Sequence, residues 1–308
     1  MIQPAKRTVT GIVKRIYREN LWSYFFISPA LVLFLVMTCY PLIQAAIMAF
    51  YTYDRFKGGS ISHPLFVGWS NYHEVLRSPV FWKSMRNTLI FAGVVVPVST
   101  GMTLFLSFLI HPLHRAYQSF FKSAFYLPGI ASEAVLALIW FWIFNPAFGV
   151  LNYFLSRIGL GPIYWLADAK WALPSIILMA IVSGWGINVI IFTTAIDHIP
   201  GSLYEAAKID GANSRKQFWH ITLPLLRPAT LFVLVMGTIS SLQVFTPIYM
   251  LTRGGPNNAT KTVVYLIYET AFQFQQLGKA AAQAFVLFVL IILFTMIQFR
   301  FLQPRAEF

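Results

Sequence analysis

Long apolar runs separated by shorter polar segments form the main pattern along this chain. Each of the six runs exceeds the ~18 residues that suggest a helix crossing the hydrocarbon core of a membrane. The runs are continuous rather than alternating, which favours helices over the strands of a barrel. The sequence therefore predicts an all-α polytopic membrane protein with six transmembrane helices, over residues 24–51, 87–110, 121–145, 172–196, 229–250 and 280–302.

The composition is that of a membrane protein. Of the 308 residues, 57% are hydrophobic and only 11% are charged, against about 25% charged in a typical soluble domain. The first run resembles a signal peptide, but it is longer than the roughly 7–15 apolar residues of one, and no small-residue cleavage site ends it. We expect a cytoplasmic segment over 1–23, one six-span transmembrane domain over 24–302 and a cytoplasmic tail over 303–308.

Basic residues indicate the orientation in the membrane. Cytoplasmic loops are enriched in Lys and Arg, so the basic segment before the first run predicts a cytoplasmic N-terminus. Six spans then return the C-terminus to the same side, as expected of a multi-pass membrane protein surrounded by lipid. The formal net charge of +13 is spread over the loops without a dense basic tract, which argues against a nucleic-acid partner. The basic residues before the first run are Lys6, Arg7, Lys14, Arg15 and Arg18.

Proline lies inside or near the edge of most predicted spans. In membrane helices proline produces kinks, because neighbouring helices can satisfy the carbonyl that it leaves free. Two interpretations stay open: kinked helices that line a moving pathway, and the general frequency of proline in membrane helices. The prolines are Pro41, Pro97, Pro128, Pro174 and Pro247.

A polar segment from Tyr204 to Pro228 interrupts the apolar pattern between the fourth and fifth runs. Ser202 with Glu205, and Ser214 with Gln217, have the spacing of capping boxes, and Gly211 is placed to end the first of two short helices. The segment is therefore predicted to fold as helix, glycine turn, helix. Such a hairpin between two spans indicates a docking surface for another protein.

The spacing Glu205-Ala206-Ala207, followed by Asp210-Gly211, resembles the coupling motif of binding-protein-dependent ABC importer permeases. The wider pattern is similar to the carbohydrate-uptake, maltose-transporter-like branch of that family. Further matching segments are Phe66-x-Gly68-x-x-Asn71-Tyr72, Asn87-Thr88, Leu127-Pro128, Phe144-Asn145-Pro146 with Gly149 and Asn152, Leu223-Pro224-Leu225 with Pro228, and Gly254-Gly255-Pro256.

The resemblance implies a type I importer fold in a bacterial cytoplasmic (inner) membrane, with a coupling hairpin over 200–228 that fits a cleft of a cytoplasmic ATPase. It also implies the partners: a second homologous permease subunit, two ATPase subunits and an extracytoplasmic solute-binding protein. The chain has no Gly-x-x-x-x-Gly-Lys-Ser/Thr loop, so ATP and Mg would be bound by the partner ATPases. We find no nucleophile–base pair and no metal-ligand spacing, and therefore expect neither catalysis nor a cofactor or metal in this chain.

Glu133 is the acidic residue that lies well inside a predicted span, about 18 Å along a helix counted from Phe121. An ionisable group at that depth suggests a functional site, although a neutral or paired glutamate between helices is the alternative. Trp185 is a candidate for stacking on a sugar, and Asn188 is a weaker candidate. The resemblance implies sugar contacts at Gly129, Glu133, Ser183, Gly184, Ile187, Ile239, Ser240 and Gln243.

Two other functions stay open at this point. A permease for glycerol-phosphate or another polar solute would be favoured by basic residues along the pathway, and the sequence has none firmly inside a span. A self-contained secondary transporter would require inverted repeats and midplane ion sites. The resemblance favours the import of a sugar or oligosaccharide, driven by ATP hydrolysis on separate subunits.

Overall fold

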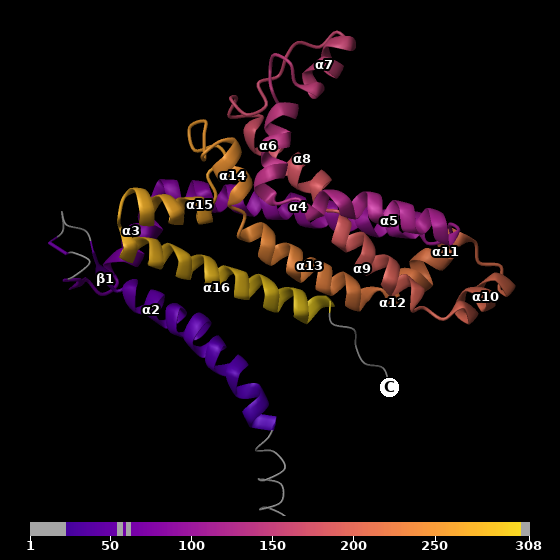
Figure 1. The fold of residues 1–308 in the computed structure, drawn as a ribbon, viewed down its shortest axis with the longest axis horizontal. Coiled ribbons are helices and arrows are strands. Elements are labelled where there is room, and N and C mark those ends of the chain that lie inside the picture. The colour runs from indigo at the N-terminus through magenta and orange to yellow at the C-terminus, as the bar shows by residue number, and fades with distance from the viewer. Residues whose placement is uncertain (1–22, 54–57, 60–62, 303–308) are drawn as a thin grey trace, which may run out of the picture.

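The computed structural model describes residues 23–53, 58–59 and 63–302. Its long helices lie side by side along the longest axis of the molecule (Figure 1), where α4 (Pro79–Ile110), α13 (Arg227–Leu242) and α16 (Leu277–Leu302) pack together and α9 (Gly186–Asp197) packs on α4. Residues 1–22 of the predicted segment 1–23, and the predicted tail over 303–308, lie outside the described residues.

The helices agree with the six predicted apolar runs. Within the described residues, four helices are long and apolar enough to cross a membrane: Ser23–Met48, Pro79–Ile110, Arg227–Leu251 and Leu277–Phe301. The count rises to six if two bent pairs each form one span. The second span begins before the predicted residue 87, because the hydroxyl of Ser78 accepts a hydrogen bond from the Phe81 N–H and caps α4.

The prediction of one continuous helix over 121–145 is wrong. Residues there form α5 (Arg115–Ile130) and α6 (Glu133–Ile143), which meet at 96°. Ala131 is extended, and Ser132 Oγ caps the new helix by accepting from the Val135 N–H at 3.3 Å. Glu133 is therefore the first residue of α6, rather than a position midway along a straight rod.

Two other spans are also interrupted. In the fourth, α8 (Ala172–Ser183) and α9 meet at 44°, and Gly184 lies between them. The fifth, Arg227–Leu251, is not sharply bent, but residues 243–245 are not helical: α13 ends at Leu242 and α14 (Thr246–Leu251) follows, with Pro247 in its first turn. Pro97 lies inside α4 without ending it, so proline alone does not determine where a span breaks.

One end of the molecule is built from short elements. They are β1 (Tyr51–Thr52) paired antiparallel with β2 (Leu65–Phe66), α3 (Ser70–Arg77), α15 (Val263–Tyr268) and the π-helical turn η4 (Glu269–Gln273). Asn87 on α4 donates to the backbone oxygens of Asn258 and Lys261, which fixes the predicted turn at 254–258 against the bundle. The Lys261 ammonium lies 2.6 Å from the carboxylate of Glu269 there, and both side chains are largely buried.

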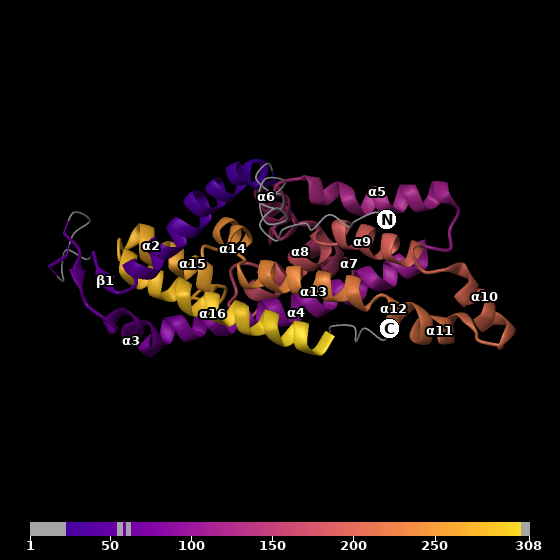
Figure 2. The same cartoon turned by 90° about the horizontal axis from the view of Figure 1, so that it is seen from below.

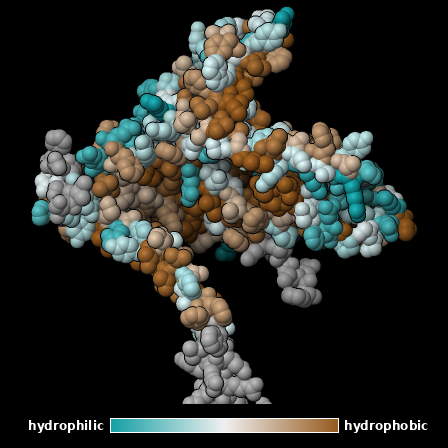
Figure 3. Space-filling model, in the orientation of Figure 1, coloured by the Kyte–Doolittle hydropathy of each residue, from teal (hydrophilic) through white to brown (hydrophobic). Residues whose placement is uncertain are grey.

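The opposite end carries α10 (Gly201–Ile209), α11 (Ser214–Gln217), the π-helical turn η3 (Phe218–Thr222) and α12 (Leu223–Leu225). Figure 2 shows α10 and α11 beyond the ends of α4, α9 and α13, at the end away from β1. Hydrophilic residues gather over this end (Figure 3).

Two parts of the chain project from opposite sides of the bundle (Figure 1). One is the first span, which includes the π-helical turn η1 (Leu35–Cys39) and α2 (Tyr40–Met48) and is 0% buried within this chain. The other is α6 with α7 (Val150–Arg157). Hydrophobic residues cover α6 and α2 (Figure 3). The core itself lies between α4, α6, α8 and α14, with a second cluster where α3, α4 and α15 meet α16.

Candidate functional site

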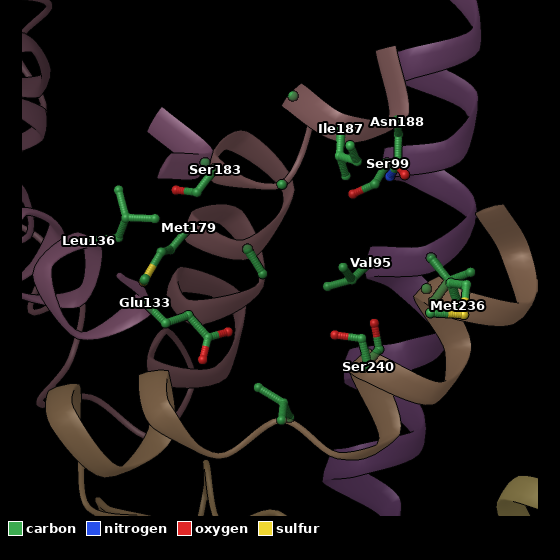
Figure 4. Close-up of a pocket in the computed structure, with 18 of the residues that line it drawn as sticks. Val95, Ser99, Glu133, Leu136, Met179, Ser183, Ile187, Asn188, Met236 and Ser240 are labelled. Carbon is green, nitrogen blue, oxygen red and sulfur yellow. The ribbon is translucent and has the colours of Figure 1, made fainter. Parts of the chain in front are cut away.

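A cavity of about 580 Å³ lies where the three interrupted spans come together (Figure 4). Gly129, Ala131 and Glu133 border it at the first break. The other two breaks contribute to the same lining, as does the middle of α4. This arrangement agrees with the rule that irregular backbone at membrane depth is tolerated where it lines a cavity or is buried in protein. The residues from the other breaks and α4 include Ser183, Gly184, Gly186, Ser240, Ser241, Val244, Pro247, Val95, Ser99 and Thr100.

The polar groups of the cavity lie on facing walls. Figure 4 shows the Glu133 carboxylate pointing into the space, with Ser240 of α13 across from it and Ser99 and Asn188 on the same far side. Glu133 is the one charged residue among the described residues of the lining. Among the residues that the structure describes, none forms a hydrogen bond or an ion pair with the Glu133 carboxylate.

The structure brings most of the predicted pathway residues together. Gly129, Glu133, Ser183, Gly184, Ile187 and Ser240 all line the cavity, and so does Asn188. Ile239 and Gln243 are absent from the lining: Ile239 is half-buried one residue before Ser240, and Gln243 is the exposed C-cap of α13.

The side chains around the second break have specific partners. Trp140 Nε1 donates to Ser183 Oγ at 3.0 Å, which joins α6 to the end of α8 and occupies this hydroxyl as an acceptor. Trp185 is outside the lining, and its ring meets Phe125 edge-on at 6.0 Å. The predicted stacking of Trp185 on a sugar therefore has no support from this arrangement.

Sequence reasoning missed the contribution of the second span. Ser99 and Thr100 lie in the middle of α4 and supply polar groups to the cavity wall, together with Tyr126 from α5. The available signal was the pair of hydroxyl residues two and three positions after Pro97, within an otherwise apolar run. Ser99 and Thr100 face the cavity because of the way α4 is rotated against α9 and α13. A local sequence pattern does not show that rotation.

Gly186 is required where α9 meets α5. A Cβ at this position would lie 2.7 Å from the backbone oxygen of Phe125 and 2.7 Å from the Cα of Tyr126. Real Cβ atoms essentially never approach other atoms below 3.0 Å, and both neighbours here are backbone atoms that cannot rotate away. The absence of a side chain at Gly186 therefore sets the spacing of two cavity walls.

The polar segment folds as the predicted helix–turn–helix. Gly211 has φ +77°, and the N–H groups of Gly211 and Ala212 donate to the backbone oxygens of Lys208 and Ala207 at 3.1 and 2.8 Å. This is a Schellman motif, in which glycine takes the left-handed conformation at low cost. The prediction that Gly211 ends the first helix is confirmed.

Both predicted capping boxes are wrong in detail. The N-cap of α10 is Pro200, with no side-chain hydrogen bond, and Ser202 lies inside the helix. The N-cap of α11 is Asn213, whose side-chain oxygen accepts from the Lys216 N–H at 2.9 Å, in place of Ser214. Asn competes well with Ser for this position, because its side chain reaches the same backbone donors.

The hairpin is attached to the bundle on one side and open on the other. The rings of Phe218 and Phe108 pack with centroids 4.8 Å apart, and the Tyr204 and Thr222 hydroxyls lie 2.9 Å apart. Glu205, Ala206, Asp210 and Gly211 are exposed, and Ala207 is half-buried. Ile209 is 87% exposed at the tip of the hairpin.

Comparisons with known proteins agree with these features. Residues 111–308 match the family described as the binding-protein-dependent transport system inner membrane component. The chain belongs to this family of ABC importer permeases.

Among its relatives is the sn-glycerol-3-phosphate transport system permease protein UgpA of Agrobacterium fabrum, which is 33% identical over 95% of this chain and 98% of that protein. Another is the lactose transport system permease protein LacF of Rhizobium radiobacter, 34% identical over 95% of this chain and 97% of that protein. A solved bacterial ABC transporter for the import of the acidic polysaccharide alginate has the same fold, with a TM-score of 0.83, 23% identity, and coverage of 96% of this chain and 99% of that one.

This permease is a multi-pass protein of the inner membrane that works in an ABC complex with a binding protein and ATPases, and it belongs to the carbohydrate and glycerol-phosphate type. It is a transport subunit rather than an enzyme, and no cofactor is expected in this family. Among the residues that the structure describes, no group of three or more His, Cys, Asp or Glu side chains could hold a metal ion.

Proposed function

We propose that this permease forms half of the translocation pathway for a sugar or oligosaccharide that an extracytoplasmic binding protein delivers. The observation that carries the proposal is the convergence of three interrupted spans on one cavity with a carboxylate, hydroxyls and an amide on its walls. Its volume of about 580 Å³ lies in the range of small-molecule sites, roughly 300–1,000 Å³. Sugars need many hydrogen-bonding partners, which Glu133, Ser240 and Asn188 supply.

A second related permease is proposed to complete the pathway. The first span is 0% buried within this chain, and α6 exposes Leu138, Ile139 and Trp142. Lipid covers part of such surfaces, but the two projections extend well beyond the bundle (Figure 1). A homologous subunit packed against both projections would give a cavity with walls from both permeases.

Two ATPase subunits are proposed to drive transport through the coupling hairpin over 200–228. Glu205 and Asp210 offer charge to a partner, and Ala206 and Ala207 offer a surface without bulk that a partner can approach closely. The last helix, α16, ends toward the same end of the molecule as α10 (Figure 1). We therefore propose that the hairpin and both termini are cytoplasmic.

The test is ATP-driven uptake in proteoliposomes that contain the complete complex and its binding protein, with sugars first selected by calorimetry on that binding protein. Glu133→Gln should lower uptake at least about tenfold, since a hydrogen bond to a charged group contributes roughly 1.5–3 kcal/mol, and Ser240→Ala should lower it about fivefold, since a neutral hydrogen bond contributes roughly 1 kcal/mol. The matched control is Ser156→Ala on the exposed face of α7, outside the cavity lining. Normal uptake by both cavity variants, in a complex that assembles fully, would refute this location of the pathway.

A further inference from the structure

The carboxylate of Glu133 differs in its surroundings from several other acidic groups of the chain. Asp197 lies 3.3 Å from His111, Glu269 lies 2.6 Å from Lys261, and Glu74 lies 3.7 Å from Lys279. The described residues place no basic side chain in ion-pair contact with Glu133. The lining of its cavity likewise includes no Lys, Arg or His among the described residues.

We propose that Glu133 makes the cavity a charge filter, which admits uncharged polyhydroxylated solutes and rejects anionic ones such as phosphorylated or carboxylated sugars. This inference rests on the proposed function, because it names the substrate class of the same cavity. Glu133 is then a specificity-determining residue for the solute that passes.

The physical basis is the weak screening inside the cavity. Apolar side chains such as Val95, Leu136 and Met236 make up much of the wall, so a charge in the cavity is less screened than in bulk water. Clefts lined by one sign of charge within low-dielectric walls raise the local concentration of the opposite sign and lower that of the same sign. An unpaired carboxylate therefore opposes a phosphate or carboxylate that enters the same space.

The same geometry suits hydroxyl groups. An ionised carboxylate only accepts hydrogen bonds, and a sugar hydroxyl can donate to it while accepting from a neighbour. Ser240 and Asn188, on the facing wall, can provide such neighbours. A phosphate has no donors to offer at its ionised oxygens, so it would face Glu133 with repulsion and without a compensating bond.

This distinction matters because sequence similarity does not separate the two classes. The relative named for glycerol-3-phosphate and the relative named for lactose are 33% and 34% identical to this chain. The carboxylate that lines the cavity of this chain favours the uncharged solute.

The experiment measures the potential of the cavity without requiring transport. Cys39 is the single cysteine of the chain, so Cys39→Ser gives a background free of native thiols in this subunit. Ser240→Cys then places a thiol across from Glu133 (Figure 4). In the assembled complex, this thiol is modified with two methanethiosulfonate reagents, one carrying a cationic trimethylammonium group and one carrying an anionic sulfonate. The rates of the two modifications are then compared. The cation-to-anion rate ratio should fall on the order of tenfold when Glu133→Gln is added, and Glu133→Asp should preserve most of it.

Two further variants keep this test decisive. Asn188→Cys repeats it from another position on the lining, in case Ser240→Cys does not assemble. Ser156→Cys on the exposed α7 is the matched control, and its ratio should not respond to Glu133→Gln. An unchanged ratio at both cavity positions would overturn the charge filter. Uptake of glycerol 3-phosphate as fast as that of the sugar selected on the binding protein would overturn it as well. A ratio that depends on Glu133 in a complex that takes up no sugar would instead refute the proposed function and leave the filter standing.

Discussion

Replacing Gly186 with alanine should force α5 and α9 apart beside the cavity. The added Cβ would lie 2.7 Å from both the backbone oxygen of Phe125 and the Cα of Tyr126, where at least 3.0 Å is needed. Each contact requires a shift of a few tenths of an ångström, and two rigid backbone segments must make it together. Overpacking of this kind typically costs about 1–3 kcal/mol. Gly186→Ala should therefore lower the stability of the permease. It should also move α5 and α9 apart where Gly186 and Tyr126 line the cavity.

Thermal unfolding of the purified complex, together with uptake in proteoliposomes, measures both effects. The matched control is Gly93→Ala in the interior of α4, where a Cβ would meet nothing within 4 Å. Alanine is favoured over glycine in a helix by about 1 kcal/mol, so this control should be neutral or slightly stabilising. If Gly186→Ala matched the wild type in both assays, the close approach of the two helices would not be required.

Two other predictions concern the ends of the molecule. Gly211→Val should reduce the coupling of ATP hydrolysis to uptake, because a side chain at φ +77° costs about 1–2 kcal/mol and disrupts the turn that ends α10. An unchanged ratio of sugar imported to ATP hydrolysed would contradict docking through this hairpin. Lys261→Met should destabilise the end of the molecule that carries α15 and η4 by about 3 kcal/mol, because it leaves the largely buried carboxylate of Glu269 unpaired. Adding Glu269→Leu should restore much of the melting temperature, and a double variant as unstable as Lys261→Met alone would show that the ion pair is not the cause.

The features that sequence reasoning predicted correctly depend on neighbouring residues. The apolar runs are local, and so is the glycine turn at Gly211, whose hydrogen bonds join residues at most five positions apart. The errors inside the hairpin are also local. The N-caps of α10 and α11 are Pro200 and Asn213, whereas the capping boxes predicted Ser202 and Ser214. Several residues here have capping propensity, and only the backbone conformation decides which of them is the cap.

The candidate site was predicted in part. Resemblance pointed to three spans, and Glu133, Ser183 and Ser240 do line one cavity. The prediction that Glu133 lies midway along a straight helix is wrong, because the chain bends by 96° just before it. The walls supplied by Ser99 and Thr100 could not be predicted, since they depend on the rotation of α4 within the bundle.

The sequence by itself determined that this protein is a six-run membrane permease with a glycine-centred helical hairpin, because hydrophobic length, turn chemistry and motif spacing are properties of neighbouring residues. Only the tertiary structure decided that three spans break at one place and that Glu133 faces Ser240 across a shared cavity. Those residues are more than a hundred positions apart, and their meeting depends on backbone contacts such as Gly186 on Phe125. The free energy that holds a broken helix in place comes from such packing, which a local pattern does not contain.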